Sequence, residues 1–82
     1  MAEKQNHSDA FGIVLRAYRQ ERGLTLEQLS ERVGVVHSFI HSLESGKKQP
    51  SFDMVLRLAA ALGVRPGELV DAVAEREATK GK

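Results

Sequence analysis

A short segment near the middle of the chain contains most of the side chains that could do chemistry, and it reads GVVHSFIHSLESGKKQP. His37 and His41 are four residues apart, so both imidazoles share one face if the segment is helical. That spacing is typical of two metal ligands, but zinc needs three or four ligands and the chain has no cysteine. We therefore predict no metal site and no cofactor, and expect both histidines to face solvent or DNA.

Serine and histidine together also raise the possibility of hydrolysis, because Ser38 and His41 can be neighbours on that face. A serine nucleophile needs a base, an acid that orients the base, and a cleft for the substrate. A small helical bundle offers no predicted cleft, and no acid is placed to orient His41. The sequence therefore predicts no catalytic residue and no enzyme.

Hydrogen bonding by short side chains is the remaining chemistry. At about 100° per residue the apolar residues of the segment share one arc: Val36, Phe39, Ile40 and Leu43. The polar residues share the opposite arc: His37, Ser38, His41, Ser42 and Ser45. Short polar side chains allow a helix to come close to a surface, as entry into the DNA major groove requires. A solvated helix face has the same pattern, so both interpretations stay open here.

Two adjacent lysines, Lys47 and Lys48, follow this segment directly. They are either a solvated loop or a contact to phosphates beside a DNA-binding helix. The net charge of +1 favours neither, because the distribution of charge matters more than its sum. The segment GELVDAVAERE is acidic, which leaves room for one basic face elsewhere.

The elements that position these residues are predicted from glycine stops and capping residues. Ser8 can cap a first helix, Thr25 and Gln28 form a capping box, and Pro66 suits a first helical position. We expect a flexible arm over residues 1–8, a disordered tail over residues 78–82, and one domain over residues 9–77 with five helices, at about 9–22, 25–33, 37–45, 52–62 and 66–77.

Length and composition limit the chain to one small domain of 82 residues. The absence of cysteine excludes disulfides. No apolar run approaches the roughly 18 residues that span a membrane, and the polar start lacks the apolar core of a signal peptide. We therefore expect no membrane association and a cytoplasmic location.

Three stretches, RAYRQERGLTLEQLSERVGV, IHSLESGKKQPS and LRLAAALGV, together resemble the phage-repressor-like (Cro/XRE-type) helix-turn-helix family. The similarity runs from about Phe11 to Leu69, which is most of the chain. It implies an all-α fold, a compact five-helix lambda-repressor-like helix-turn-helix domain, with the third helix in the major groove of double-stranded DNA.

The resemblance also implies roles for single residues. Base edges are reached from the start of the third helix and from one turn later, here by His37, Ser38 and Ser42, and His41 shares their face. Phosphates are contacted by the start of the second helix and by residues after the third: Thr25, Leu26, Ser45, Lys47 and Lys48. A structural ion pair is expected between Arg19 and Glu44.

This sequence departs from the family pattern at two places near the DNA face. Val36 stands where Ser or Thr usually caps the third helix, and Leu26 stands where Gln often touches phosphate. The base-facing positions also lack long two-pronged readers such as Arg and Gln. These departures favour modest direct readout.

Some of the apolar surface of this chain cannot be covered within so small a fold, which predicts a homodimer. The residues expected at its interface are Ile13, Leu69, Val70 and Val73. Two copies would match two half-sites one DNA turn apart. We therefore expect a sequence-specific DNA-binding transcriptional regulator that acts as a homodimer. The alternative is a protein-interaction module, antitoxin-like or an adaptor, with secondary DNA binding and a protein partner encoded nearby.

Overall fold

The computed structural model describes residues 7–80, and in that range the secondary structure consists of helices joined by short turns. The five helices are α1 (His7–Glu21), α2 (Leu26–Val33), α3 (His37–Glu44), α4 (Phe52–Leu62) and α5 (Pro66–Lys80). The predicted all-α, five-helix fold is therefore confirmed. None of these helices is long and apolar enough to cross a membrane.

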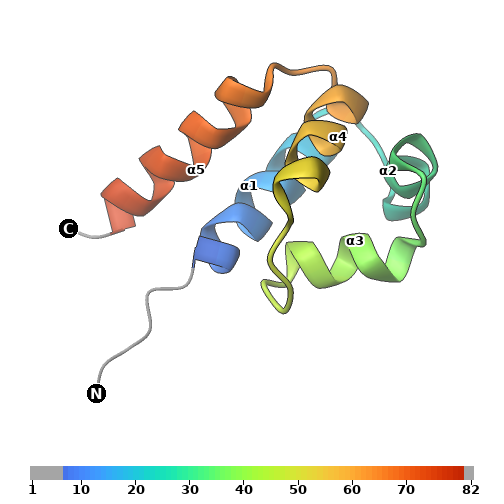
Figure 1. Ribbon diagram of the computed structural model, residues 1–82, viewed down its shortest axis with the longest axis horizontal. Coiled ribbons are helices and arrows are strands. Elements are labelled where there is room, and N and C mark those ends of the chain that lie inside the picture. Colours follow the sequence, from blue (N-terminus) through green and yellow to red (C-terminus); the bar gives the residue numbers. More distant parts are fainter. Residues whose placement is uncertain (1–6, 81–82) are drawn as a thin grey trace.

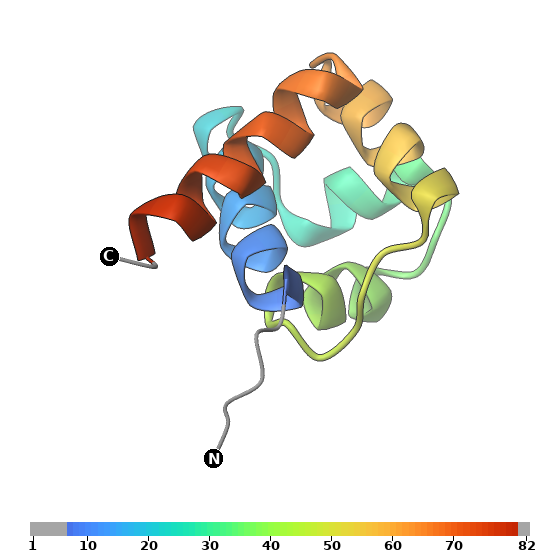
Figure 2. The ribbon, with the colours of Figure 1, turned by 60° about the vertical axis from the view of Figure 1, so that its left-hand side comes forward.

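Each helix packs mainly against two others, so the contacts between helices form a closed ring. Helix α1 lies between α5 and α3, α3 also packs on α2, α2 on α4, and α4 on α5 (Figures 1 and 2). The side chains at the centre of this arrangement are fully buried: Leu15, Leu29, Ile40, Leu43, Leu58 and Leu69. Burying one such side chain contributes about 1.5–3 kcal/mol, so six of them are a large part of the stability of a small domain.

Local capping signals predicted several helix ends. The Thr25 hydroxyl accepts from the Gln28 amide at 3.0 Å, and the Gln28 side chain accepts from the Thr25 amide at 2.9 Å, which completes the expected capping box. The glycines after α2 and α4, Gly34 and Gly63, have φ of 92° and 76°. A left-handed residue there satisfies the last carbonyls of each helix, and only glycine adopts it without strain.

The outer ends of α1 and α5 differ from the prediction. Helix α1 begins at His7, and Ser8, the expected cap, lies inside the helix and is buried. Helix α5 continues to Lys80, so the expectation of a tail from residue 78 was wrong for residues 78–80. The two ends support each other, because the His7 imidazole pairs with the Glu77 carboxylate. The rest of the expected arm and tail, residues 1–6 and 81–82, lies outside the described residues.

Candidate nucleic-acid interface

The α2–turn–α3 unit is held by backbone hydrogen bonds and by buried side chains of α3. The amides of Gly34 and Val35 both donate to the Ser30 carbonyl, at 2.7 and 3.1 Å, which fixes the turn between the two helices. Ile40 and Leu43 are fully buried and anchor α3 to the core. The opposite side of α3 therefore faces outward, at the bottom of the molecule in Figure 1, whereas the α4–α5 turn is at the top.

The outward face of α3 contains the polar residues that were predicted from the sequence to share one face. His37, Ser38 and His41 are exposed, and Ser42 is half-buried. The Ser42 hydroxyl donates to the Ser38 carbonyl at 3.1 Å, and the Ser45 hydroxyl donates to the Ser42 carbonyl at 3.2 Å. Their protons are thus bonded to the helix itself, while the oxygen lone pairs remain open as acceptors.

Val36 occupies the N-cap of α3 with no side-chain capping hydrogen bond, as its side chain predicts. Its side chain is 69% exposed. The first amides of a helix have no partner within the helix, so those of His37 and Ser38 are open to a ligand that accepts hydrogen bonds.

The expected ion pair between Arg19 and Glu44 is present and is two-pronged. Arg19 Nε donates to Glu44 Oε2 at 2.6 Å, and Arg19 Nη2 donates to Oε1 at 3.0 Å. A third donor of the same guanidinium, Nη1, reaches the Leu24 carbonyl at 2.8 Å. The two side chains are only 12% and 6% exposed. This pair fixes the end of α3 to α1 and to the loop before α2.

A glycine brings the backbones of the same two helices together. A Cβ atom added at Gly12 would lie 2.5 Å from the Leu43 carbonyl oxygen and would also collide with the Glu44 carbonyl. Real Cβ atoms essentially never come this close to another atom. Gly12 therefore permits α1 to support the C-terminal end of α3 directly.

The lysine pair lies where the chain folds back over the end of α3. The amides of Lys47 and Lys48 donate to the Ser42 carbonyl at 3.0 and 3.3 Å. Both side chains are exposed, and within the described part of the chain neither forms an ion pair. Both charges are available to a ligand.

A cleft of about 180 Å³ lies between α1, the start of α2 and α3. Five of its lining residues were predicted as site residues and one, Arg16, was not. The lining consists of Arg16, Arg19, Leu26, His41, Glu44 and Ser45. It brings the start of α2 next to the second half of α3. The sequence reasoning missed Arg16, although it lies one turn before Arg19 on α1.

The residues predicted for a dimer interface are not all at the surface. Leu69 is fully buried in the core, so its assignment to an interface was wrong. Its position on α5 is filled by packing against the chain's own helices. Val70 is 53% exposed, and with the half-buried Val73 it lines an apolar cleft of about 210 Å³. Ile13 is 44% exposed but does not line that cleft.

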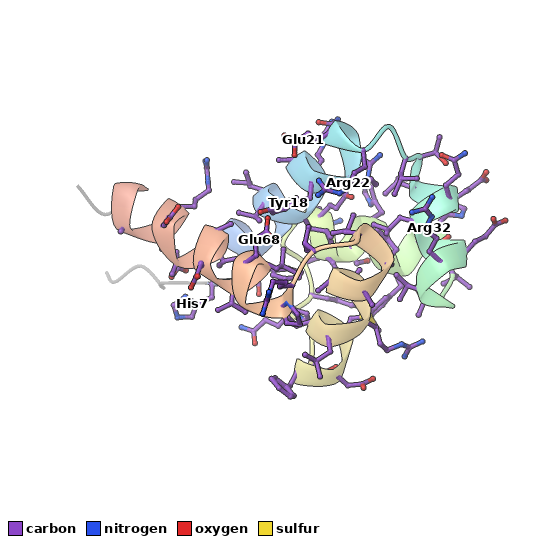
Figure 3. The ribbon with its side chains drawn as sticks, turned by 90° about the horizontal axis from the view of Figure 1, so that it is seen from above. His7, Tyr18, Glu21, Arg22, Arg32 and Glu68 are labelled. Atoms are coloured by element: carbon purple, nitrogen blue, oxygen red, sulfur yellow. The ribbon has the colours of Figure 1, made fainter. Side chains whose placement is uncertain are left out.

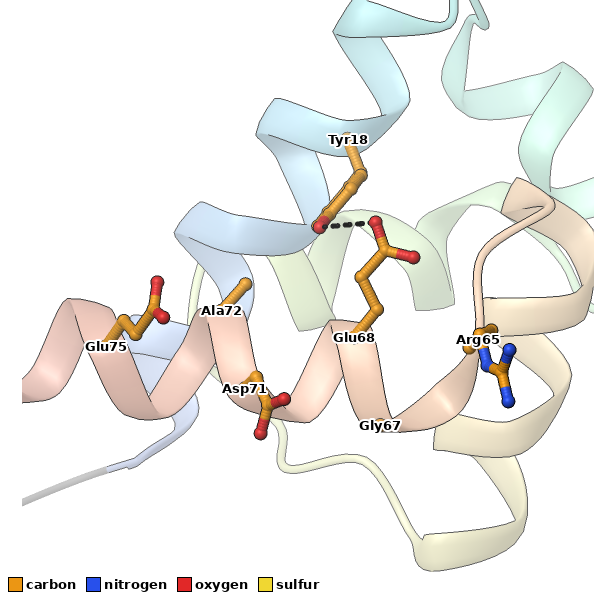
Figure 4. A pocket seen from close by; sticks show the side chains of 7 residues that line it. All are labelled: Tyr18, Arg65, Gly67, Glu68, Asp71, Ala72 and Glu75. Atoms are coloured by element: carbon orange, nitrogen blue, oxygen red, sulfur yellow. Dashed lines mark hydrogen bonds between the residues drawn. The ribbon is translucent and has the colours of Figure 1, made fainter.

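The side of the molecule around Tyr18 is acidic, in contrast to the loop that contains Lys47 and Lys48. A cleft of about 510 Å³ between α1 and α5 includes the carboxylates of Glu68, Asp71 and Glu75 (Figure 4). The Tyr18 hydroxyl lies 3.5 Å from Glu68 Oε2, at the border of α1 and α5 (Figure 3). Partial burial, and next the negative charge of Glu68, raise the pKa of Tyr18 above 10.0. An acidic surface of this kind repels nucleic acid.

Comparison with known proteins places the arrangement in a family. A family model described as a helix-turn-helix domain matches residues 10–73. An uncharacterized HTH-type transcriptional regulator of Methanothermobacter thermautotrophicus is 48% identical over 50 residues, which is 61% of this chain and 72% of that protein.

Two solved structures have the same fold. One is the clp gene regulator ClgR from Corynebacterium glutamicum, with a TM-score of 0.89 and 26% identity over 96% of this chain and 84% of that one. The other is the restriction-modification controller protein C.AhdI from Aeromonas hydrophila, with a TM-score of 0.73 and 35% identity over 76% of this chain and 94% of that one. Because the family model matches most of the chain and the α2–turn–α3 unit is formed, the chain belongs to the Cro/XRE-type helix-turn-helix family of transcriptional regulators.

Proposed function

We propose that this regulator binds DNA in a sequence-specific manner as a homodimer, with α3 in the major groove. The observation that carries the proposal is the exposed polar face of α3, on a helix held rigidly by the Arg19–Glu44 pair. His37 and Ser38 lie at the start of α3 and face base edges, and Ser42 follows one turn later. Imidazole and hydroxyl groups each offer one hydrogen bond to a base rather than the paired bonds of Arg or Gln.

Backbone contacts complete the proposed interface. The exposed Thr25 and the half-buried Leu26 present the start of α2 to one phosphate, and Ser45 lies near the same place. Lys47 and Lys48 contact phosphates beyond the end of α3. These contacts fix the position of the helix but carry no sequence information, so much of the specificity comes from half-site spacing and DNA shape.

The dimer is supported by apolar surface on α5. Val70 and Val73 line a cleft together with Phe11 and Pro50, and this cleft is mostly apolar in character. A second copy that covers the cleft would remove Val70 from water. Two joined copies then present two α3 helices to half-sites one turn apart.

Selection of bound sequences from a random DNA pool tests the proposal. We expect wild type to enrich a pseudo-palindrome, and His37→Ala to lose the preference at one base pair of each half-site. Arg65→Ala, at an exposed position in the distant α4–α5 turn, serves as the control and should select the wild-type sequences. Failure of wild type to enrich any sequence would contradict sequence-specific binding.

A second function is favoured by exposed apolar side chains outside the dimer cleft. Phe52 is 78% exposed and Val36 is 69% exposed, which suits the surface of a protein-interaction module with secondary DNA binding. In that case a protein partner covers these residues. Wild type that selects no DNA sequence, together with a stable complex formed through Phe52, would favour this alternative.

A further inference from the structure

The cleft between α1, the start of α2 and the second half of α3 has an unbalanced positive charge. Arg19 and Glu44 neutralise each other through their paired hydrogen bonds. Arg16 lines the same cleft and is exposed, and among the described residues no hydrogen bond or ion pair is formed by its guanidinium.

Several other arginines, unlike Arg16, have structural partners within the described part of the fold. Arg22 donates to the Leu62 carbonyl at 2.7 Å, and Arg57 donates to the Val33 carbonyl at 2.8 Å. Each of these two neutralises a helix end, where cations are favourable. Arg16 lies in the third turn of α1 and does not neutralise a helix end.

Three further groups around the cleft can donate hydrogen bonds to an anion. His41 contributes an imidazole from α3, and Ser45 a hydroxyl that can rotate away from the Ser42 carbonyl. At the start of α2 the Thr25 hydroxyl is already used as an acceptor by the Gln28 amide, so the Leu26 amide remains open. The only carboxylate of the lining, Glu44, is held by Arg19.

We propose that this cleft binds one phosphate of the DNA backbone, with Arg16 as its principal cation and His41 as a second ligand. The proposal rests on the DNA-binding function above and adds a residue to it. A phosphate contact fits better than base readout, because Arg16 belongs to the supporting helix α1 and not to α3. It also assigns His41 to the backbone, one helical turn after the base-facing His37.

The test compares Arg16→Gln and Arg16→Lys with Arg65→Gln, a matched control because Arg65 is also exposed and lies far from α3. Affinity is measured by fluorescence anisotropy for the selected duplex and for a scrambled duplex of equal length, across a series of salt concentrations. Arg16→Gln should weaken both duplexes by a similar factor of about ten. The slope of log affinity against log salt should shrink by about 0.9. Arg16→Lys should keep the slope, and Arg65→Gln should match wild type.

Two outcomes would overturn the proposal while leaving the proposed function intact. Arg16→Gln could match Arg65→Gln in affinity and slope, which would place the cleft away from DNA. It could instead alter the selected sequence, which would make Arg16 a base reader. Circular dichroism checks that each variant keeps its helical signal.

A second measurement does not depend on DNA recognition. Inorganic phosphate titrated into wild type should shift the amide resonances of Leu26 and Ser45, and the shifts should be lost in Arg16→Gln. If wild type binds no duplex, the proposed function fails, yet these shifts would still support an anion site. Unchanged amide resonances together with an unchanged salt slope would overturn the site itself.

Discussion

Gly12 shows how a single missing side chain supports the proposed DNA-reading helix. The backbone carbonyls of Leu43 and Glu44, at the end of α3, lie against the place where a Cβ atom would be. Both obstacles are backbone atoms near the buried end of a helix, so they cannot move aside as a flexible side chain can. The support of α3 therefore depends on glycine at this position.

Gly12→Ala should lower the free energy of unfolding by about 1–3 kcal/mol, as overpacking of a close contact does. The matched control is Gly67→Ala on α5, where an added Cβ would meet nothing within 4 Å. Alanine favours a helix more than glycine does, so Gly67→Ala should raise the free energy of unfolding by up to about 1 kcal/mol. Urea denaturation measures both, and equal effects of the two substitutions would contradict the close contact.

At the scale of elements, the ionisation of Tyr18 can be used to measure the contact between α1 and α5, because it is the only tyrosine of the chain. Burial and Glu68 raise the pKa of Tyr18, so an ultraviolet absorbance titration should have its midpoint above 10. Glu68→Gln should lower that midpoint, and Glu21→Gln should lower it less, because Glu21 is the smaller cause. The unfolded phenol ionises first, so the protein should also become easier to unfold as the pH rises above 10. A midpoint insensitive to Glu68→Gln would mean that the two helices do not pack as described.

The loop after α3 gives a separate prediction. If Lys47 and Lys48 neutralise phosphates, the double alanine variant should weaken all DNA sequences alike. Its slope of log affinity against log salt should shrink by about 0.9 for each lost contact. A slope equal to that of wild type would place the loop away from DNA.

Sequence reasoning predicted the elements well where the signal is local. The Thr25–Gln28 capping box and the glycines at 34 and 63 determine helix ends through bonds to near neighbours. It failed at Ser8 and Leu69, because their burial depends on how α1 and α5 pack together. Arg16 was missed for a related reason, since the cleft that gives it a role is built from three separate helices.

At the scale of the whole molecule, the proposed dimer depends on the surface of α5. Val70→Asp places a charge in the apolar cleft and should shift the protein to monomer in sedimentation equilibrium at micromolar concentration, with its helical signal retained. Val70 is preferred over Val73 for this test, because Val73 also packs against the core. Ile13→Asp, on the outer face of α1, should leave the dimer intact. A monomer produced by Ile13→Asp alone would move the interface to α1, and a monomeric wild type would contradict the dimer.

The closed order of helix contacts has a mechanical consequence. Helix α3 is tied to α1 by an ion pair and a backbone contact, and to α2 by a fixed turn, while α4 and α5 complete the circuit. These contacts hold α3 on several sides, so in the proposed complex we expect it to have little freedom to swing toward an imperfect site. In the proposed complex the adjustment therefore falls on the DNA, which must bend or twist to meet two rigid bodies. Base pairs that the protein never touches would then influence affinity through the work needed to deform them.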